Sequence, residues 1–120
     1  MKLIIAGSRT IEVNEHTIQD LISHFDIKPD IVLSGGASGI DSCGERYADL
    51  VGAEIELHKA EWDKYGRAAG PRRNEQMAKE ADALLLIWDG GSNGSRNMKQ
   101  NMKHLGKPVY EVILMGDNNE

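Results

Sequence analysis

Cysteine, positive charge and long apolar runs are all scarce in this chain. The single cysteine, Cys43, has no partner for an internal disulfide, which excludes a disulfide-stabilised secreted domain and favours a reducing compartment. The net charge of −5 argues against the broad basic face that nonspecific nucleic-acid binding requires. The first apolar run, residues 2–6, is too short for a signal-peptide core or a membrane span. We therefore expect a soluble, cytoplasmic protein with no membrane partner.

Clusters of metal-ligating or nucleophilic side chains are also missing. The histidines show none of the spacings typical of metal ligands, so we expect no metal and no cofactor. They stand at His16, His24, His58 and His104. No combination of serine, histidine and aspartate indicates a nucleophile, and we expect Cys43, which follows an apolar helical spacing, to lie in the core.

Short apolar runs alternate with helical patterns along the 120 residues, which predicts one globular domain covering 1–120. The predicted strands are 2–6, 31–33, 53–57, 83–88 and 108–114. The predicted helices are 14–25, 40–51, 71–80 and a fourth that follows a loop at 89–95 and ends at Gly106. Apolar positions assign buried faces to two of these helices: Ile40, Cys43, Tyr47, Leu50 and Val51 in the second, and Met98, Met102 and Leu105 in the fourth. A frayed tail is expected over 115–120, and the segment 60–70 is expected to be a loop.

This alternation with short connections predicts an α/β fold: a Rossmann-like three-layer sandwich with a mostly parallel five-stranded sheet. We expect the strand order 3-2-1-4-5. Ligands of such sheets bind at the carboxyl ends of the strands, where the strand order reverses. The loops after the first, second and fourth strands should therefore meet in one crevice.

The loop after the second strand is the main candidate for binding an anion. Glycines allow close backbone approach, and the following helix start presents unpaired N–H groups and the positive end of its dipole. The candidate residues are Gly35, Gly36, Ala37, Ser38, Gly39 and Asp41. A phosphate cradle is favoured over a plain structural turn because Ser34 and Ser38 add hydroxyl groups. Asp41 is interpreted either as a cap of the helix or as an acceptor for a ribose or base.

Two further loops add candidates to the same crevice. Arg9 follows the first strand and is placed to bind a phosphate with its guanidinium group, beside Gly7 and Ser8. The loop after the fourth strand is rich in glycine and serine, and is a second candidate cradle before a helix. Its candidate residues are Asp89, Gly90, Gly91, Ser92, Gly94 and Ser95.

The stretch from Pro71 to Asn74 places two arginines in what we expect to be the first turn of a helix, with Pro71 at its first position. Cations are unfavourable at a helix N-terminus, so Arg72 and Arg73 together indicate a bound anion; the alternative is that they are solvated. Trp62 and Tyr65, just upstream, could stack on a base, or Trp62 could pack the loop onto the sheet.

Taken together, these motifs resemble the SLOG superfamily of Rossmann-like nucleotide binders, which includes DprA, the LOG phosphoribohydrolases and YpsA-like proteins. The resemblance covers nearly the whole chain and is nearest to the small stand-alone YspA/YpsA-related branch. The segments that carry it are 7–9, 34–41, 62–74 and 89–95. It implies binding of a nucleotide or a nucleotide-derived ligand, and assembly into homo-oligomers.

Two members of the superfamily offer sharper comparisons. The residues of 35–41 together with 71–74 are similar to the DprA pattern, whose domain binds single-stranded DNA, although this chain is acidic. The loop 90–95 is similar to the LOG glycine loop, but Met98 stands where the LOG enzymes carry a glutamate. A catalytic carboxylate would have to come from Asp41, Glu75 or Asp89.

The leading hypothesis is a nucleotide-binding protein in which Arg9, Arg73 and the amides of 35–41 hold phosphate. Trp62 or Tyr65 would contact the base, and Asp89 or Asn74 the sugar. The alternative is hydrolysis of the N-glycosidic bond of a nucleoside monophosphate, with one carboxylate stabilising an oxocarbenium-like sugar. Binding of single-stranded DNA is a weaker third possibility.

Overall fold

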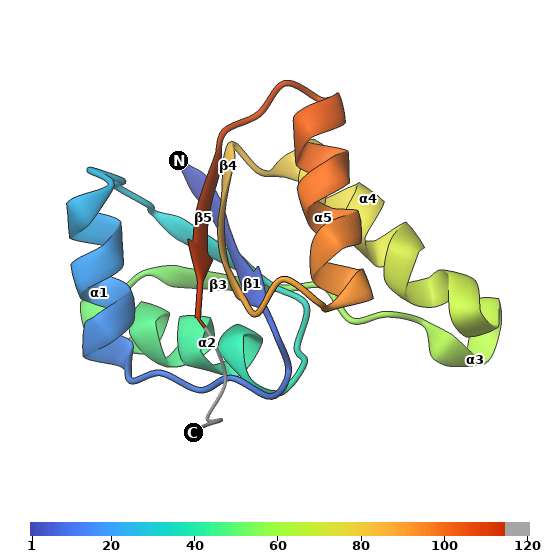
Figure 1. Ribbon diagram of the computed structural model, residues 1–120, viewed down its shortest axis with the longest axis horizontal. Helices are drawn as coiled ribbons and strands as arrows, with labels where there is room; N and C mark the ends of the chain where they lie inside the picture. Colours follow the sequence, from blue (N-terminus) through green and yellow to red (C-terminus); the bar gives the residue numbers. More distant parts are fainter. Residues whose placement is uncertain (115–120) are drawn as a thin grey trace.

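The computed structural model describes residues 1–114 as one sheet flanked by helices (Figure 1). The strands are β1 (Lys2–Gly7), β2 (Ile31–Ser34), β3 (Glu54–Leu57), β4 (Ala83–Trp88) and β5 (Val109–Ile113). The helices are α1 (Glu15–His24), α2 (Ile40–Val51), α3 (Trp62–Tyr65), the 3₁₀ turn η1 (Gly66–Ala68), α4 (Ala69–Glu80) and α5 (Asn93–His104).

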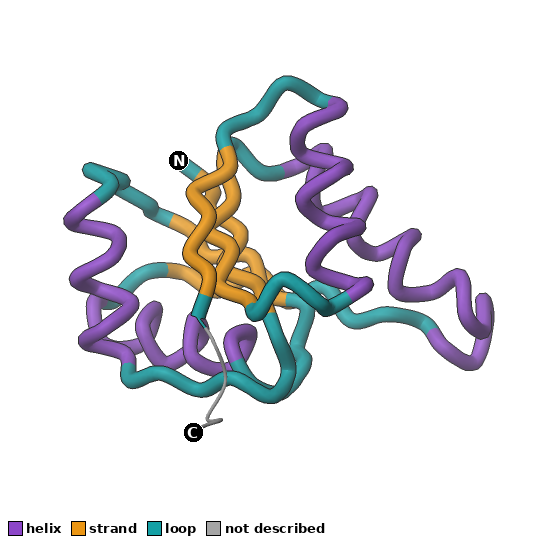
Figure 2. Tube along the Cα trace, in the orientation of Figure 1, coloured by secondary structure: helices purple, strands orange, loops and turns teal. Residues whose placement is uncertain are grey.

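The strands form one five-stranded sheet in the order β3-β2-β1-β4-β5, and each neighbouring pair is parallel. Helices α1 and α2 cover one face, while α4 and α5 cover the other (Figures 1 and 2). These features confirm the predicted α/β, Rossmann-like fold and its strand order. The order reverses between β1 and β4, whose carboxyl ends lie side by side with Gly7 opposite Ile87.

Alternation along the strands divides the core between the two faces of the sheet, since successive side chains of a strand point in opposite directions. In β1, Leu3 and Ile5 pack with the buried residues of α1 and α2. Between them, Ile4 packs on the other face with Met98 and Met102 of α5. The prediction that these two methionines belong to the core is confirmed.

The segment 60–70 is not the loop that we predicted. Helix α3 and the η1 turn occupy most of it, and α4 already begins at Ala69. Pro71 is therefore at the third position of α4 instead of the first. The helix tolerates it there because the first-turn N–H groups have no intrahelical acceptor. Similarly, α5 begins at Asn93, inside the segment predicted to be a loop.

Three apolar residues assigned to buried helix faces are exposed instead: Leu50 and Val51 at the end of α2, and Leu105 after α5. Each follows the apolar spacing of its helix. Each also lies at the end of that helix, beyond the residues that pack on the sheet. The predicted tail, 115–120, lies outside the described residues. Within residues 1–114, no helix combines the length and the apolar character needed to cross a bilayer.

Candidate functional site

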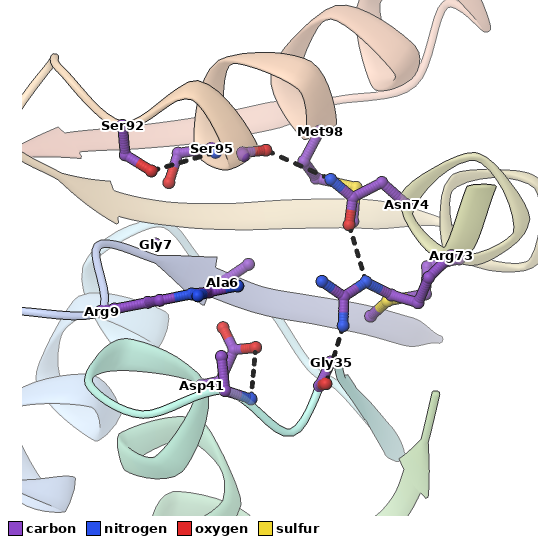
Figure 3. Close-up of a pocket in the computed structure, with 13 residues that line it drawn as sticks. Ala6, Gly7, Arg9, Gly35, Asp41, Arg73, Asn74, Ser92, Ser95 and Met98 are labelled. Carbon is purple, nitrogen blue, oxygen red and sulfur yellow. Dashed lines mark hydrogen bonds between the residues drawn. The ribbon is translucent and has the colours of Figure 1, made fainter. Parts of the chain in front are cut away.

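A cavity of about 210 Å³ lies at the carboxyl ends of β1 and β4, where the strand order reverses (Figure 3). Its walls come from the ends of β1 and β2, from the first turn of α2, from residues 73–77 of α4 and from the start of α5. The residues that line it are Ala6, Gly7, Arg9, Gly35, Ala37, Asp41, Arg73, Asn74, Met77, Ser92, Gly94, Ser95 and Met98. The three loops expected to meet in one crevice therefore do so.

The loops approach so closely that side chains would not fit at two glycines. A Cβ on Gly7 would lie 1.7 Å from the carbonyl oxygen of Ile87 in β4. A Cβ on Gly39 would lie 2.4 Å from the carbonyl oxygen of Ser8, and Gly39 also has a φ of +73°. Both glycines therefore serve close packing behind the cavity wall.

Arg73 is fixed in place by contacts on two of its three guanidinium nitrogens (Figure 3). Its Nη1 donates to the carbonyl oxygen of Gly35 at 2.7 Å and, more weakly, to that of His58 at 3.4 Å. Its Nε donates to Oδ1 of Asn74 at 2.9 Å. Within residues 1–114 its Nη2 has no acceptor. Arg73 is therefore a preorganised cation whose third nitrogen is available to a ligand.

Asn74 positions Arg73 and links α4 to α5. Besides accepting from Arg73, it donates through Nδ2 to the carbonyl oxygen of Gly94 at 3.2 Å and to Oδ1 of Asn97 at 3.0 Å. Both ends of this buried amide are thus occupied by protein partners. Asn74 lines the cavity, but its side chain acts on a ligand through Arg73 and not by direct contact.

Asp41 is a buried carboxyl group in the cavity wall. Its side chain is 6% exposed, and Oδ2 accepts a hydrogen bond from the backbone N–H of Ala37 at 3.2 Å. Burial raises the pKa of Asp41 to about 6, against the opposing effects of the Ala37 N–H, Arg73 and Arg9. Asp41 does not cap α2, because Gly39 occupies the N-cap position. Its hydrogen bond closes the preceding glycine loop instead.

The glycine loop before α2 has fewer free donors than its sequence suggests. The amide of Gly36 donates to Oγ of Ser34, and the amide of Ile40 donates to the carbonyl oxygen of Ser8. The Ser34 hydroxyl in turn donates to Oε2 of Glu45 at 2.6 Å. With the Ala37 amide occupied by Asp41, this loop shapes the cavity more than it supplies donors to it.

A polar group without a hydrogen-bond partner among residues 1–114 lies at the start of α5. Ser92 caps the helix by accepting from the Ser95 backbone N–H at 3.3 Å. Ser95 lines the cavity, and within residues 1–114 its buried hydroxyl has no hydrogen-bond partner. A buried hydroxyl without a partner costs free energy, and a helix N-terminus attracts anions. Ser95 therefore marks the end of the cavity where a ligand oxygen is expected.

Arg9 extends across the cavity from the end of β1, above Asp41 (Figure 3). Its backbone carbonyl oxygen accepts from Oγ of Ser38 at 3.4 Å, which ties the loop after β1 to the loop before α2. Arg9 and Arg73 thus bring two guanidinium groups to one cavity, as the sequence predicted.

Several predicted site residues lie in neighbouring hollows and not in this cavity. Trp62 is 52% exposed and lines an adjoining hollow of about 340 Å³ that also contains Arg9 and Arg73. Gly36 and Ser38 line this same hollow. Tyr65 and Arg72 line a separate groove beside α4, where the guanidinium group of Arg72 stacks 4.1 Å from the centre of the Tyr65 ring.

Of the three candidate catalytic carboxylates, only Asp41 lines the cavity. Glu75 is exposed, lines the groove with Tyr65, and pairs with Lys79 at 3.9 Å. Asp89 is also exposed, and its Oδ1 accepts from the Gly91 backbone N–H at 2.8 Å.

The remaining candidates support the wall from outside. Gly90 and Gly91 do not line the cavity, and Ser8 is buried with its hydroxyl accepting from the Asp89 backbone N–H at 3.2 Å.

A search of known proteins finds a relative of similar length. The chain is 31% identical, over an alignment of 125 positions, to the Gene 61 protein of Mycobacterium phage D29, with 97% of each chain covered. The chain belongs to the Gene 61 protein family. No protein-family profile matches it, and no solved structure matches it.

In this Gene 61 family member, the sequence analysis missed three parts of the site. Met98 was assigned to a buried helix face alone and Met77 was not among the candidates, although both line the cavity. The carbonyl oxygen of His58 accepts a hydrogen bond from Arg73, and no local sequence pattern predicts this contact. Asn97 accepts a hydrogen bond from Asn74. Asn93, Asn97 and Asn101 recur every four residues along α5, and this polar stripe was a signal in the sequence that could have indicated the contact.

Proposed function

We propose that this Gene 61 family member binds a nucleotide or a nucleotide-derived phosphate ligand in the cavity, and that its SLOG resemblance reflects a shared ligand class. The observation that supports this most is the Ser95 hydroxyl, which is buried without a partner at the N-terminus of α5. A phosphate oxygen at this position would accept its hydrogen bond and would interact with the positive end of the helix.

Two cations in the cavity add to this argument. Arg9 lines the same cavity, and Arg73 keeps Nη2 free while its other nitrogens are held. A guanidinium group binds phosphate through parallel hydrogen bonds, and a prepositioned one loses little side-chain entropy on binding. Asp41 is the one carboxylate among the described residues that line the cavity, and its single charge does not balance both cations.

The size of the cavity also bears on the ligand. At about 210 Å³ it is smaller than typical sites for whole drug-sized ligands. The adjoining hollow beside Trp62 shares Arg9, Gly35, Ala37 and Arg73 with it. A nucleotide could place its phosphate and sugar in the cavity and its base against the exposed face of Trp62.

The test is titration calorimetry of the protein with nucleoside monophosphates, using the matching nucleosides as controls. We expect the nucleotides to bind and the nucleosides to bind far more weakly. Arg73→Ala removes a charge-assisted hydrogen bond and should weaken binding by about 10- to 150-fold. The control is Arg67→Ala, because Arg67 is exposed in the η1 turn and lies outside the cavity.

Equal affinity for nucleoside and nucleotide would contradict the proposal, as would an unchanged isotherm for Arg73→Ala. A thermal melt of both variants shows whether each one is folded, so that a loss of binding is not mistaken for unfolding.

A second candidate function, hydrolysis of an N-glycosidic bond, is favoured by one observation. Asp41 is a buried carboxyl facing the cavity, and its pKa of about 6 lets it exchange a proton near neutral pH. Release of free base from a nucleoside monophosphate, measured by chromatography, should then be abolished by Asp41→Asn. Asp89→Asn is the matched control, since Asp89 lies outside the cavity. If the unmodified protein releases no base from any nucleotide, the binding function alone stands.

A further inference from the structure

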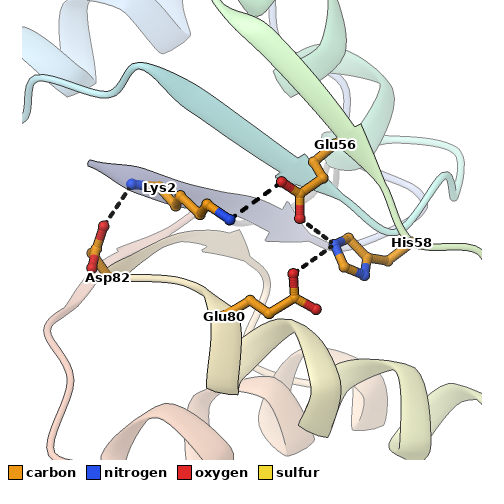
Figure 4. A network of polar contacts seen from close by, with 5 residues as sticks. All are labelled: Lys2, Glu56, His58, Glu80 and Asp82. Atoms are coloured by element: carbon orange, nitrogen blue, oxygen red, sulfur yellow. Dashed lines mark hydrogen bonds and ion pairs between the residues drawn. The ribbon is translucent and has the colours of Figure 1, made fainter.

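A second polar cluster lies away from the cavity, between β3 and the end of α4 (Figure 4). It consists of Glu56 on β3, His58 just after β3, and Glu80, the last residue of α4. The Nε2 atom of His58 lies 3.1 Å from Oε1 of Glu56 and 4.0 Å from Oε1 of Glu80. One ligand atom from each residue lies within 4.8 Å of the other two.

The imidazole is held rigidly between the two carboxylates. The side chain of His58 is only 11% exposed. Its backbone N–H donates to the carbonyl oxygen of Ser34 at 2.8 Å, and its own carbonyl oxygen accepts from Arg73. Neighbouring backbone contacts on both sides thus fix where His58 leaves the sheet, and this preorganises its side chain.

Within residues 1–114, the cationic groups near Glu56 and Glu80 do not neutralise both carboxylates. Lys2 lies 3.5 Å from Oε2 of Glu56, on the side of the carboxylate away from the imidazole. Among the described residues, Glu80 has no cationic partner within 4.0 Å apart from His58. Nε2 of an imidazole carries at most one hydrogen, so it cannot fully satisfy both carboxylates. Two carboxylates therefore share one imidazole.

We propose that Glu56, His58 and Glu80 form a binding site for a divalent transition-metal ion, with Zn²⁺ as the reference ion. One imidazole nitrogen and two carboxylate oxygens are a ligand set that such ions accept. With metal–ligand bonds of about 2.0–2.2 Å, two ligand atoms on a tetrahedral ion lie about 3.3 to 3.6 Å apart. Nε2 of His58 lies slightly closer than this to Glu56, at 3.1 Å, and slightly farther from Glu80, at 4.0 Å. The exposed side chain of Glu80 can move to close that gap.

Three protein ligands would leave at least one coordination position open to water or another molecule. This inference does not rest on the proposed binding of nucleotides.

The test is calorimetric titration of the full chain with ZnCl₂, after removal of metals with a chelator and dialysis. We expect one saturable binding event per chain. Glu80→Gln and His58→Gln should each weaken it by at least about tenfold, which is the lower bound seen even for residues that only orient a ligand. Glu75→Gln on the same helix and His104→Gln at the end of α5 are matched controls and should leave the isotherm unchanged.

Absence of saturable binding would overturn the proposal, as would an isotherm that Glu80→Gln does not alter. If Glu80→Gln lowers the melting temperature of the metal-free protein but leaves zinc binding intact, the three residues are a structural ion-pair network. Glu80→Gln keeps the size of a partly exposed side chain, so a folded variant is expected, and circular dichroism verifies it. Competition by excess Mg²⁺ would overturn the choice of a transition metal, because Mg²⁺ prefers oxygen ligands and water over imidazole.

Discussion

Asp41 is a carboxyl group whose burial in the cavity wall costs free energy when it ionises. Its carboxyl group is almost fully removed from water, and this desolvation outweighs the attraction of Arg73 and Arg9. Its pKa therefore rises from 3.8 to about 6 on folding. The folded protein binds this proton more tightly than the unfolded chain, so stability should fall as pH rises from about 4 to about 6.

Replacing Asp41 by asparagine should remove that cost. Asparagine keeps an oxygen that can accept from the Ala37 N–H but cannot ionise. We expect Asp41→Asn to raise the free energy of unfolding at about pH 8 by about 1 to 3 kcal/mol, as follows from a pKa shift of this size. Below about pH 3 the difference should vanish, because the wild-type carboxyl is then protonated in both states.

Urea unfolding of both proteins across this pH range measures the difference. Asp49→Asn, on an exposed position of the same helix, is the control and should show no pH-dependent gain. A lower stability of Asp41→Asn at every pH would mean that the carboxylate stabilises the fold, contrary to this argument.

At the scale of the helices, glycine has opposite consequences in α2 and α5. In α2, Gly44 faces the sheet, and a Cβ there would lie 2.8 Å from Cβ and Cγ2 of Ile5. The helix can pack this close to β1 only because position 44 has no side chain. In α5, Gly94 is in the first turn, and a Cβ there would meet nothing within 4 Å.

The same substitution should therefore have opposite signs in the two helices. Gly44→Ala should lower the free energy of unfolding by about 1 to 3 kcal/mol, because the helix must move away from the sheet. Gly94→Ala should raise it by up to about 1 kcal/mol, because alanine loses less backbone entropy in a helix. Urea unfolding of the two variants measures both effects. Equal effects of the two substitutions would show that the close approach of α2 to β1 is not maintained in solution.

Local patterns predicted which helices and strands form and in what order, but they misplaced some of the boundaries. Strand β4 and helix α1 lie where their local patterns predicted them. The start of α4 was misplaced because Pro71 suits the first turn at several positions, and only the packing of α3 and η1 against α4 settles which one it takes. Contacts with distant parts of the chain decide such boundaries.

At the scale of the whole molecule, β4 contributes buried side chains to the apolar core on both faces of the sheet. All six of its residues are buried, and its side chains alternate between the two apolar clusters on either face of the sheet. Leu85 packs with residues from α1 and α2, while Leu84 and Leu86 pack with those of α4 and α5. A defect in β4 should therefore weaken the entire domain cooperatively.

We expect Leu85→Ala to lower the free energy of unfolding by about 2 to 5 kcal/mol, since it leaves a cavity in a fully buried site. Leu50→Ala, at an exposed position on α2, should change it by no more than about 0.5 kcal/mol. Urea unfolding followed by circular dichroism measures both, and the slope with denaturant should stay the same for each. A similar loss in the two variants would contradict the burial pattern described above.

The sequence by itself determined the class of fold, the strand order and the edge of the sheet at which the cavity lies. It could do so because apolar periodicity is local and short connections restrict how parallel strands are joined. It also named most of the residues around the cavity, including Arg9, Arg73 and Asp41.

Only the tertiary structure decided which candidates face one another. Arg72 and Arg73 are neighbours in the chain, but successive helical residues point about 100° apart. One therefore stacks on Tyr65 in a separate groove and the other enters the cavity. The partnerless hydroxyl of Ser95 and the convergence of Glu80 on His58 likewise depend on contacts between distant segments. No local pattern encodes such contacts, because they are set by how helices pack on the sheet.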